Sequence, residues 1–270
     1  MSELARVRAS SEPVTRARIA ADLGVLGVRP GSVLLVHSSL SALGWVCGGA
    51  QAVVEGLLDA LGPDRTLVVP AHTSGNCDPA SWANPPVPER WWPVIRAEMP
   101  AFDPRVTPTQ GMGAIAEAAR SWPGARRSAH PQVSFAAIGP QAEAVTAAHV
   151  LESGFGERSP VARALDLDAD VLLLGVGHAS NSSLHLAEHR VPDPPRESSS
   201  AAVATPEGGR WATWEDVVAD EEDFERLGAA FDATGRTRTG RAGEGEAHLM
   251  RQRELVEFAA GWLAANRPAR

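Results

Sequence analysis

The stretch SVLLVHSSLSALGWVCGGAQAVVEGLLDALGPDRTLVVPAH, residues 32–72, decides the fold of this 270-residue chain. Its first part, 32–37, is a short apolar run that ends in polar residues, as buried strands do. The middle part, 48–62, has apolar residues at helical spacing and ends on Gly62, a common helix stop. A second apolar run at 66–72 predicts another strand. This order predicts two parallel strands joined by a crossover helix.

The rest of the chain extends this unit into an α/β fold. We expect further strands at 133–139 and 170–177, and helices at 113–122, 140–149, 181–190 and 246–265. Prolines, tryptophans and turn residues crowd the segment from Thr73 to Gln110, and a loop of that length is usually functional. No repeat or linker interrupts the pattern. The sequence predicts a single domain over residues 1–270, with a mostly parallel central sheet flanked by helices and a long inserted loop.

The composition of the chain excludes several classes of protein. Hydrophobic residues make up 44% of it, enough for a sizeable core. No apolar run approaches the roughly 20 residues of a membrane helix. The N-terminal segment lacks the apolar region of a secretion signal. Two cysteines, Cys47 and Cys77, have neither the number for a disulfide framework nor the spacing for zinc. We therefore expect a cytoplasmic protein that does not bind membranes.

The charge of the chain points to a cationic ligand. The net charge is −8, and the segment WEDVVADEEDFE, residues 214–225, is dense in carboxylates without a lysine or arginine. Nucleic acid is a poor partner for such a surface, because phosphate binding needs clustered basic side chains. A cationic small molecule would be attracted to it. The alternative is that these acids only solvate the start of a helix.

The segment HLAEH contains His185, Glu188 and His189 in the pattern H-x-x-E-H of one class of zinc peptidases. Two histidines four residues apart share a helix face and could bind one metal, but a catalytic zinc needs a third ligand. The pair could also be purely structural. We favour a third interpretation, in which His185 is a catalytic base without a metal. It follows the strand expected at 170–177, and α/β proteins carry their reacting groups at the carboxyl ends of strands.

The segment VHSSLSALGWVCGGAQ, residues 36–51, places three hydroxyl side chains, those of Ser38, Ser39 and Ser41, before the start of a helix. Backbone N–H groups at such a position bind phosphate or a polar chain. Ordinary capping and turn formation would explain the same residues. A serine nucleophile would need an elbow such as G-x-S-x-G, which the chain lacks.

Five longer stretches resemble the aminoglycoside N3-acetyltransferase family, and the resemblance as a whole runs from about residue 15 to residue 262. They are LLVHSSLSALGWVCGGAQAVVEGLLDALGPDRTLVVPAHTS, DPASWANPPVPERWW, RRSAHPQVSFAAIGP, ERSPVARALDLDADVLLLGVGHASNSSLHLAEH and GEGEAHLMRQRELVEFA. The resemblance implies an antibiotic N-acetyltransferase-like α/β fold, distinct from that of the GNAT acetyltransferases. It also implies acetyl-CoA as the donor co-substrate, an aminoglycoside as the acceptor and no metal.

The resemblance also assigns roles to individual residues. His185 matches the proposed catalytic base, and Asp220 and Glu221 fall where the family keeps carboxylates for that base. The residues implied in coenzyme A binding are His37, Ser38, Ser39, Leu40, Ser41, Arg127, Ser128 and Ser159. Those implied in binding the cationic substrate are His72, Asp78, Glu188, Asp220 and Glu221.

The chemistry that the resemblance implies suits these residue types. A substrate amine is largely protonated near neutral pH, and a histidine can take its proton so that the amine attacks the thioester. A nearby carboxylate would orient the ring. We expect direct transfer to the 3-amino group of an aminoglycoside, in a monomer or a homodimer. The alternatives are a zinc-dependent hydrolase, an acetyltransferase that acts on a different biosynthetic amine, and a non-catalytic protein that binds coenzyme A or serves as an acidic scaffold.

Overall fold

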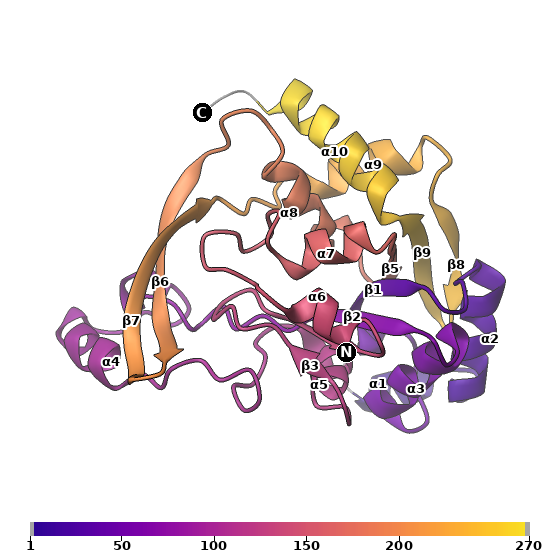
Figure 1. The fold of residues 1–270 in the computed structure, drawn as a ribbon. Helices are drawn as coiled ribbons and strands as arrows, with labels where there is room; N and C mark the ends of the chain where they lie inside the picture. Colours follow the sequence, from indigo (N-terminus) through magenta and orange to yellow (C-terminus); the bar gives the residue numbers. More distant parts are fainter. Residues whose placement is uncertain (1–2, 268–270) are drawn as a thin grey trace.

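The computed structural model describes residues 3–267, which form a seven-stranded sheet, a separate two-stranded hairpin and surrounding helices (Figure 1). The strand order in the large sheet is β3-β4-β2-β1-β5-β9-β8. Its strands are β1 (Val33–Ser38), β2 (Thr66–Pro70), β3 (Arg126–Arg127), β4 (Phe135–Ile138), β5 (Asp170–Leu174), β8 (Arg238–Ala242) and β9 (Gly245–Arg251). The hairpin consists of β6 (Arg196–Thr205) and β7 (Gly208–Val217).

The helices lie between these strands in chain order. They are α1 (Glu3–Ala9), α2 (Arg16–Leu26), α3 (Gly49–Leu61), α4 (Trp92–Glu98), α5 (Gly113–Arg120), α6 (Ala142–Thr146), α7 (Pro160–Asp166), α8 (Ser183–Glu188), α9 (Phe224–Asp232) and α10 (Gln252–Asn266). The segment predicted as a long loop contains α4 and two 3-10 turns, at Pro79–Ser81 and Glu89–Trp91.

The predicted crossover is confirmed, but the prediction of a mostly parallel sheet is wrong. Strand β1 pairs in parallel with β2 and with β5, and α3 makes the crossover between β1 and β2. The other four pairings, β2–β4, β3–β4, β5–β9 and β8–β9, are antiparallel. A parallel crossover needs about a dozen residues or more, whereas only residues 243–244 separate β8 from β9. The sheet is therefore mixed, with its parallel strands at the centre.

The helix predicted at 246–265 begins later than expected. Residues Gly245–Arg251 form β9, in which buried and more exposed positions alternate along much of the strand, and α10 starts only at Gln252. An alternation of period two is the signature of a strand with one face toward the core. Ala247 and Leu249 pack in one core cluster, whereas Met250 packs in the other.

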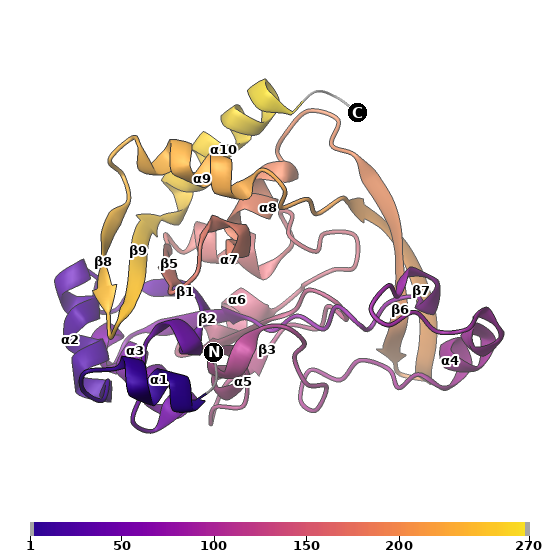
Figure 2. The same ribbon diagram turned by 180° about the vertical axis from the view of Figure 1, so that it is seen from behind.

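The core lies in two layers, one on each face of the sheet. Along β1, Leu34 and Val36 pack into the layer covered by α2, α3 and α5. Val33 and Leu35 point the opposite way, into the layer formed with α6 to α10. The two views of the ribbon show α2 and α3 at one end of the molecule and α8, α9 and α10 at another (Figures 1 and 2). Helices on both faces leave the strand ends free to carry functional side chains.

The β6–β7 hairpin stands apart from the large sheet on the side opposite α2 (Figure 1). It has its own small apolar cluster of Ala201, Ala212 and Trp214. Its links to the main body include a bridge between Phe102 and Val203.

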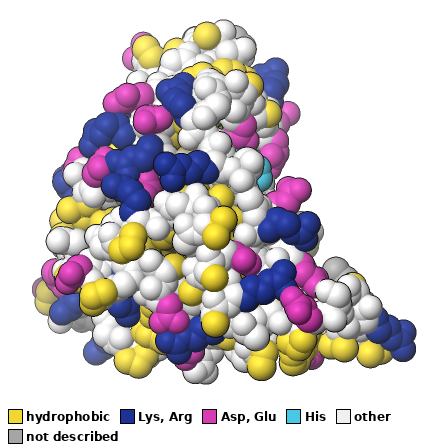
Figure 3. All heavy atoms as spheres, turned by 90° about the vertical axis from the view of Figure 1, so that its right-hand side faces the viewer, with side chains coloured by type: hydrophobic (Ala, Val, Ile, Leu, Met, Phe, Trp, Pro, Cys, Tyr) yellow, Lys and Arg dark blue, Asp and Glu magenta, His cyan; other side chains and the backbone are white. Residues whose placement is uncertain are grey.

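The surface carries charges of both signs. On the face to which α2 and β8 contribute, basic and acidic side chains lie interspersed (Figure 3). Within residues 3–267, no helix combines the length and the apolar character that crossing a membrane requires.

Candidate active site

Three histidines come from the carboxyl ends of the three central strands. His37 is the last but one residue of β1, His72 follows the end of β2, and His185 lies in α8, after β5. Since these strands are parallel, their carboxyl ends meet at one edge of the sheet, the place where α/β proteins bind ligands. The backbone N–H of Ser182 donates to Nε2 of His37 at 3.3 Å, so the neutral ring carries its proton on Nδ1.

Two of these histidines are uncharged at neutral pH. Burial, helped by the charge of His185, lowers the pKa of His37 to about 3. Burial also lowers the pKa of His72 to about 3, helped by the charges of His37 and His185. Both rings are therefore neutral and place no positive charge beside an incoming amine.

The third histidine, His185, is paired with a carboxylate on its own helix. Its Nδ1 lies 2.6 Å from Oε2 of Glu188. Residues three apart on a helix are neighbours, so one turn of α8 is enough to form the pair. Glu188 accepts the proton of Nδ1, which leaves Nε2 of the neutral ring as a lone-pair acceptor. No hydrogen bond to Nε2 is formed by the residues in 3–267. This arrangement is that of a general base held by a carboxylate.

Two phenylalanines fix the plane of the His185 ring. Phe155 stacks on it with ring centres 4.5 Å apart and an interplanar angle of 28°. Phe224, at the start of α9, contacts it at 4.7 Å with a tilt of 57°. Sequence reasoning did not identify either residue, because no spacing pattern connects them to α8. The ring is thereby confined between aromatic surfaces, with 13% of its side chain exposed.

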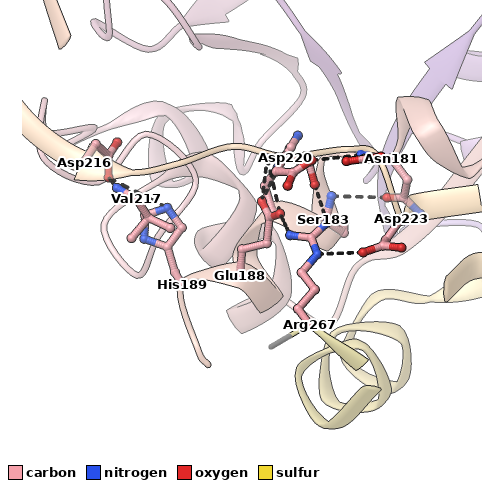
Figure 4. Close-up of polar contacts among 11 residues, drawn as sticks. Asn181, Ser183, Glu188, His189, Asp216, Val217, Asp220, Asp223 and Arg267 are labelled. Carbon is pink, nitrogen blue, oxygen red and sulfur yellow. Dashed lines mark hydrogen bonds and ion pairs between the residues drawn. The ribbon is translucent and has the colours of Figure 1, made fainter. Parts of the chain in front are cut away.

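The carboxylate of Glu188 is buried and receives three donors, and Figure 4 shows Arg267 and Asp220 beside it. Besides His185, these are the guanidinium of Arg267, at 2.5 Å, and the backbone N–H of Asp220, at 3.3 Å. A buried charge is costly unless it is paired and hydrogen-bonded, and here both conditions hold. The Asp220 side chain instead accepts from the backbone N–H of Glu222, and Glu221 is exposed.

The acidic segment 214–225 obtains its counter-charges from arginines outside it. Asp223 pairs with Arg226 at 2.7 Å and with Arg267 at 3.1 Å. The segment itself contains no lysine or arginine, but in the folded chain arginines from outside it lie next to Asp223. Arg267 follows α10 and was not identified from the sequence, because no local pattern relates it to residues 79 positions earlier.

The second histidine of HLAEH faces a different carboxylate. Nε2 of His189 lies 3.8 Å from Oδ1 of Asp216, on β7 of the hairpin. Burial lowers the pKa of His189, although the charges of Asp216 and Glu188 oppose this shift. Asp216 also accepts from the backbone N–H of Gly154 at 2.8 Å, next to Phe155. Within residues 3–267 no three His, Cys, Asp or Glu side chains gather as a metal site, so the geometry gives the zinc alternative no support.

The segment HSSLS lies at the same sheet edge as the histidines. The backbone N–H of Ser39 donates to the carbonyl of Leu174, the last residue of β5, at 2.9 Å. The hydroxyls of Ser39 and Ser41 lie 3.1 Å apart. Leu40 starts a 3-10 turn, Leu40–Ala42, and Ser38 ends β1. The hydroxyl-bearing loop and the His185 helix thus both follow strands of the central parallel group.

Other predicted site residues have partners within the chain. Arg127 donates to Ser134, Thr107, Ala71 and Thr73, and burial lowers its pKa to about 10. The buried Ser128 hydroxyl accepts from the backbone of Phe135 and lies 2.9 Å from Nδ1 of His149. Ser159 caps α7, and Asp78 pairs with Arg96. The side chains that the structure places around the carboxyl edge are those of His37, Ser39, His72 and His185, with Glu188 behind the last.

Proteins of known family resemble this chain over nearly its whole length. The family model described as aminoglycoside 3-N-acetyltransferase matches residues 35–264. The SPbeta prophage-derived aminoglycoside N(3')-acetyltransferase-like protein YokD of Bacillus subtilis is 40% identical over 262 residues, 96% of each chain. The structure of AAC-IIIb binary with CoASH has a TM-score of 0.85 at 29% identity and covers 96% of this chain and 100% of that chain. AAC-VIa bound to sisomicin has a TM-score of 0.85 at 30% identity, with the same coverage.

Proposed function

Because the chain belongs to the aminoglycoside 3-N-acetyltransferase family, we propose that it transfers the acetyl group of acetyl-CoA to the 3-amino group of an aminoglycoside. The observation that carries this proposal is the His185–Glu188 pair, whose ring has a free Nε2 at the sheet edge next to the HSSLS loop. The two similar structures that hold CoASH and sisomicin support the donor and the class of acceptor.

In this proposal His185 is the general base. Its Nε2 takes a proton from the acceptor amine as the nitrogen attacks the thioester carbonyl. A C–N bond forms, the C–S bond breaks, and the proton reaches the departing coenzyme A thiolate. Glu188 keeps the ring in the required tautomer and stabilises the imidazolium, as the carboxylate of a hydrolase triad does. General base catalysis of this kind contributes on the order of 10²–10⁴ in rate.

The neutral histidines beside the base favour this chemistry. A positive ring at His37 or His72 would raise the cost of holding a cationic amine and an imidazolium together. Burial instead keeps both rings uncharged. The remaining acceleration comes from holding the amine and the thioester in attack geometry.

The proposed donor site is the segment from His37 to Ser41. Its hydroxyls suit the amide-rich pantetheine arm. Ser39 and Ser41 are the side chains we expect to contact it, since their hydroxyls lie together on the loop. Leu40 would supply apolar contact. Arg127, Ser128 and Ser159 are proposed to shape the neighbouring backbone, because their polar atoms already have partners.

The proposed acceptor site uses the acidic groups near α8. Glu221 and Glu222 are exposed and attract a polycationic sugar. Asp220 supports the backbone beside Glu188 and is proposed to line the same region. The similar B. subtilis protein is named only as acetyltransferase-like. The experiment must therefore also detect acetyl transfer to amines other than aminoglycosides.

The test is acetyl transfer by the purified chain. The chain is incubated with acetyl-CoA and one of a panel of aminoglycosides, and the release of the coenzyme A thiol is measured. Each aminoglycoside is compared with an analogue that lacks the 3-amino group. The chain contains no lysine, so acetylation of its own lysine side chains cannot contribute to the signal. The expected product carries one acetyl group on the 3-nitrogen, located by NMR. Turnover with other amines and none with aminoglycosides would refute the proposed acceptor, and no turnover with any amine would refute the proposed reaction.

A further inference from the structure

We infer that Arg267 is a positioning residue for the base, because its guanidinium holds Glu188 in the orientation that the His185 ring requires. This inference rests on the proposed function of His185. Arg267 follows α10 and Glu188 ends α8, and these two helices pack against each other. The contact therefore brings the end of the chain's last helix to the proposed catalytic pair.

The two oxygens of Glu188 are divided between two cationic or potentially cationic partners. Oε1 accepts from Nη1 of Arg267 at 2.5 Å, whereas Oε2 lies 2.6 Å from Nδ1 of His185. A carboxylate is planar, so a partner that fixes one oxygen also fixes the direction of the other. Arg267 thereby determines where the acceptor for the His185 proton lies.

Arg267 is itself held at three further points (Figure 4). Its Nη2 donates to the backbone carbonyl of Asp220 at 2.5 Å, and its Nε donates to Asp223 at 3.1 Å. Its guanidinium lies 5.9 Å from the ring centre of Phe224, which also contacts His185. The planar fork of arginine suits such a set of acceptors, and a lysine could not reproduce it. One side chain thus connects the carboxylate, the aromatic support and the acidic segment.

Arg267 is also the charged partner that a buried carboxylate requires. Without Arg267, Glu188 would be held by fewer contacts, and the His185 ring would be held less firmly. The fraction of enzyme in which the ring has the orientation of the proposed base would therefore fall.

Other groups surround the pair and stay unchanged in the experiment. The titratable and charged side chains around His185 and Glu188 are His37 on β1, His72 after β2, His189 directly after α8 with its partner Asp216 on β7, and Asp220 and Asp223 before α9. Within residues 3–267, Arg267 is the arginine that forms an ion pair with Glu188. Replacing Arg267 therefore removes one charge from these surroundings and leaves the other groups in place.

The test compares Arg267→Gln and Arg267→Lys with the control Arg226→Gln. Arg226 is exposed and pairs with the same Asp223 but does not contact Glu188. For Arg267→Gln we expect kcat to fall by on the order of 10–10² with little change in either KM, because orientation is lost and binding is not. Arg267→Lys keeps the charge without the planar fork and should recover part of the lost kcat.

A measurement without turnover separates this inference from the proposed function. The ring resonances of His185 are assigned by their absence from the His185→Ala spectrum, and their nitrogen shifts report by NMR which ring nitrogen carries the proton. Wild type and Arg226→Gln should show one tautomer, with the proton on Nδ1, and Arg267→Gln should show a mixture of the two. A wild-type chain without acetyl transfer would refute the proposed function, and the tautomer measurement would still test Arg267. A single Nδ1 tautomer in folded Arg267→Gln would overturn the inference.

Discussion

The Nδ1 atom of His185 lies 2.6 Å from Oε2 of Glu188, one helical turn further along α8. Both residues belong to the same short helix, so their spacing along α8 brings the two side chains together. Long-range folding supplies the enclosure: Phe155 and Phe224 lie against the ring, and Arg267 lies against the carboxylate. The pair and its enclosure can therefore be tested by separate substitutions.

Replacing His185 by alanine should reduce kcat by on the order of 10²–10⁴, because the variant lacks the proposed base. Both KM values should change little, the pattern for a group that acts mainly in the transition state. Steady-state kinetics with acetyl-CoA and the best amine of the panel measure this. His189→Ala is the control, since His189 faces Asp216 rather than Glu188. Equal losses in the two variants would contradict the assignment of His185 as the base.

Glu188→Gln tests the carboxylate without removing its volume. The amide can present N–H to Nδ1, which would favour the wrong tautomer of His185 and put a proton on Nε2. Because Glu188 acts through the ring, the loss in kcat should approach but not exceed that of His185→Ala. The variant should also be less stable, because Arg267 loses its charged partner in a largely buried site. Kinetics and urea unfolding on the same preparation measure both effects. A variant with wild-type kcat would mean that Glu188 only stabilises the fold.

Ser39→Tyr tests the donor loop. Ser39 is partly buried beside Ser41, and a phenol ring there would occupy the space expected for the pantetheine arm. The KM for acetyl-CoA should rise, with a smaller effect on the KM for the amine. Ser121→Tyr provides the matched control, because Ser121 is exposed at the end of α5, away from this loop. If a folded Ser39→Tyr protein kept its donor KM, the loop would not be part of the donor site.

The buried histidines predict a loss of stability in mild acid. The pKa of His37 is about 3 in the folded chain, and that of an unfolded histidine is about 6.5. Between these values the unfolded state binds more protons, so the free energy of unfolding falls as the pH falls. From pH 7 to pH 5, one such histidine accounts for about 2 kcal/mol. His72, with a pKa of about 3, acts in the same direction.

Urea unfolding at several pH values measures this dependence. His37→Gln keeps an acceptor for the Ser182 N–H but cannot titrate, so its stability should fall less steeply between pH 7 and pH 5. Parallel curves for the variant and the wild type would mean that His37 takes up protons equally in the folded and unfolded states.

The central strands could be predicted from the sequence because their apolar runs are continuous. Strands β1, β2 and β5 are buried along nearly their whole length, and such strands leave a clear signal. In β9, next to the edge strand β8, buried positions alternate with more exposed ones. The strand is followed directly by α10, so in the sequence the two elements look like one helix. The direction of the outer strands depends on pairing across the chain, which local patterns do not encode.

The candidate site was predictable where its residues belong to one motif. His185 and Glu188 share a helix, and their spacing is visible in the sequence. Phe155 and Arg267 reach them from a loop and from the end of α10. A phenylalanine in a glycine-containing loop and an arginine after a helix have no spacing that relates them to α8. Such contacts depend on how distant elements pack, and only the folded chain brings them together.

The separation of the β6–β7 hairpin from the large sheet bears on how such a protein can diversify. The strands that carry His37 and lead to His185 belong to the seven-stranded sheet, whereas Asp216 belongs to the hairpin. Insertions or exchanges within the hairpin would leave the hydrogen bonds of the central strands intact. A lineage built on this plan can therefore remodel the tip of one exposed ribbon while the central strands keep their pairing.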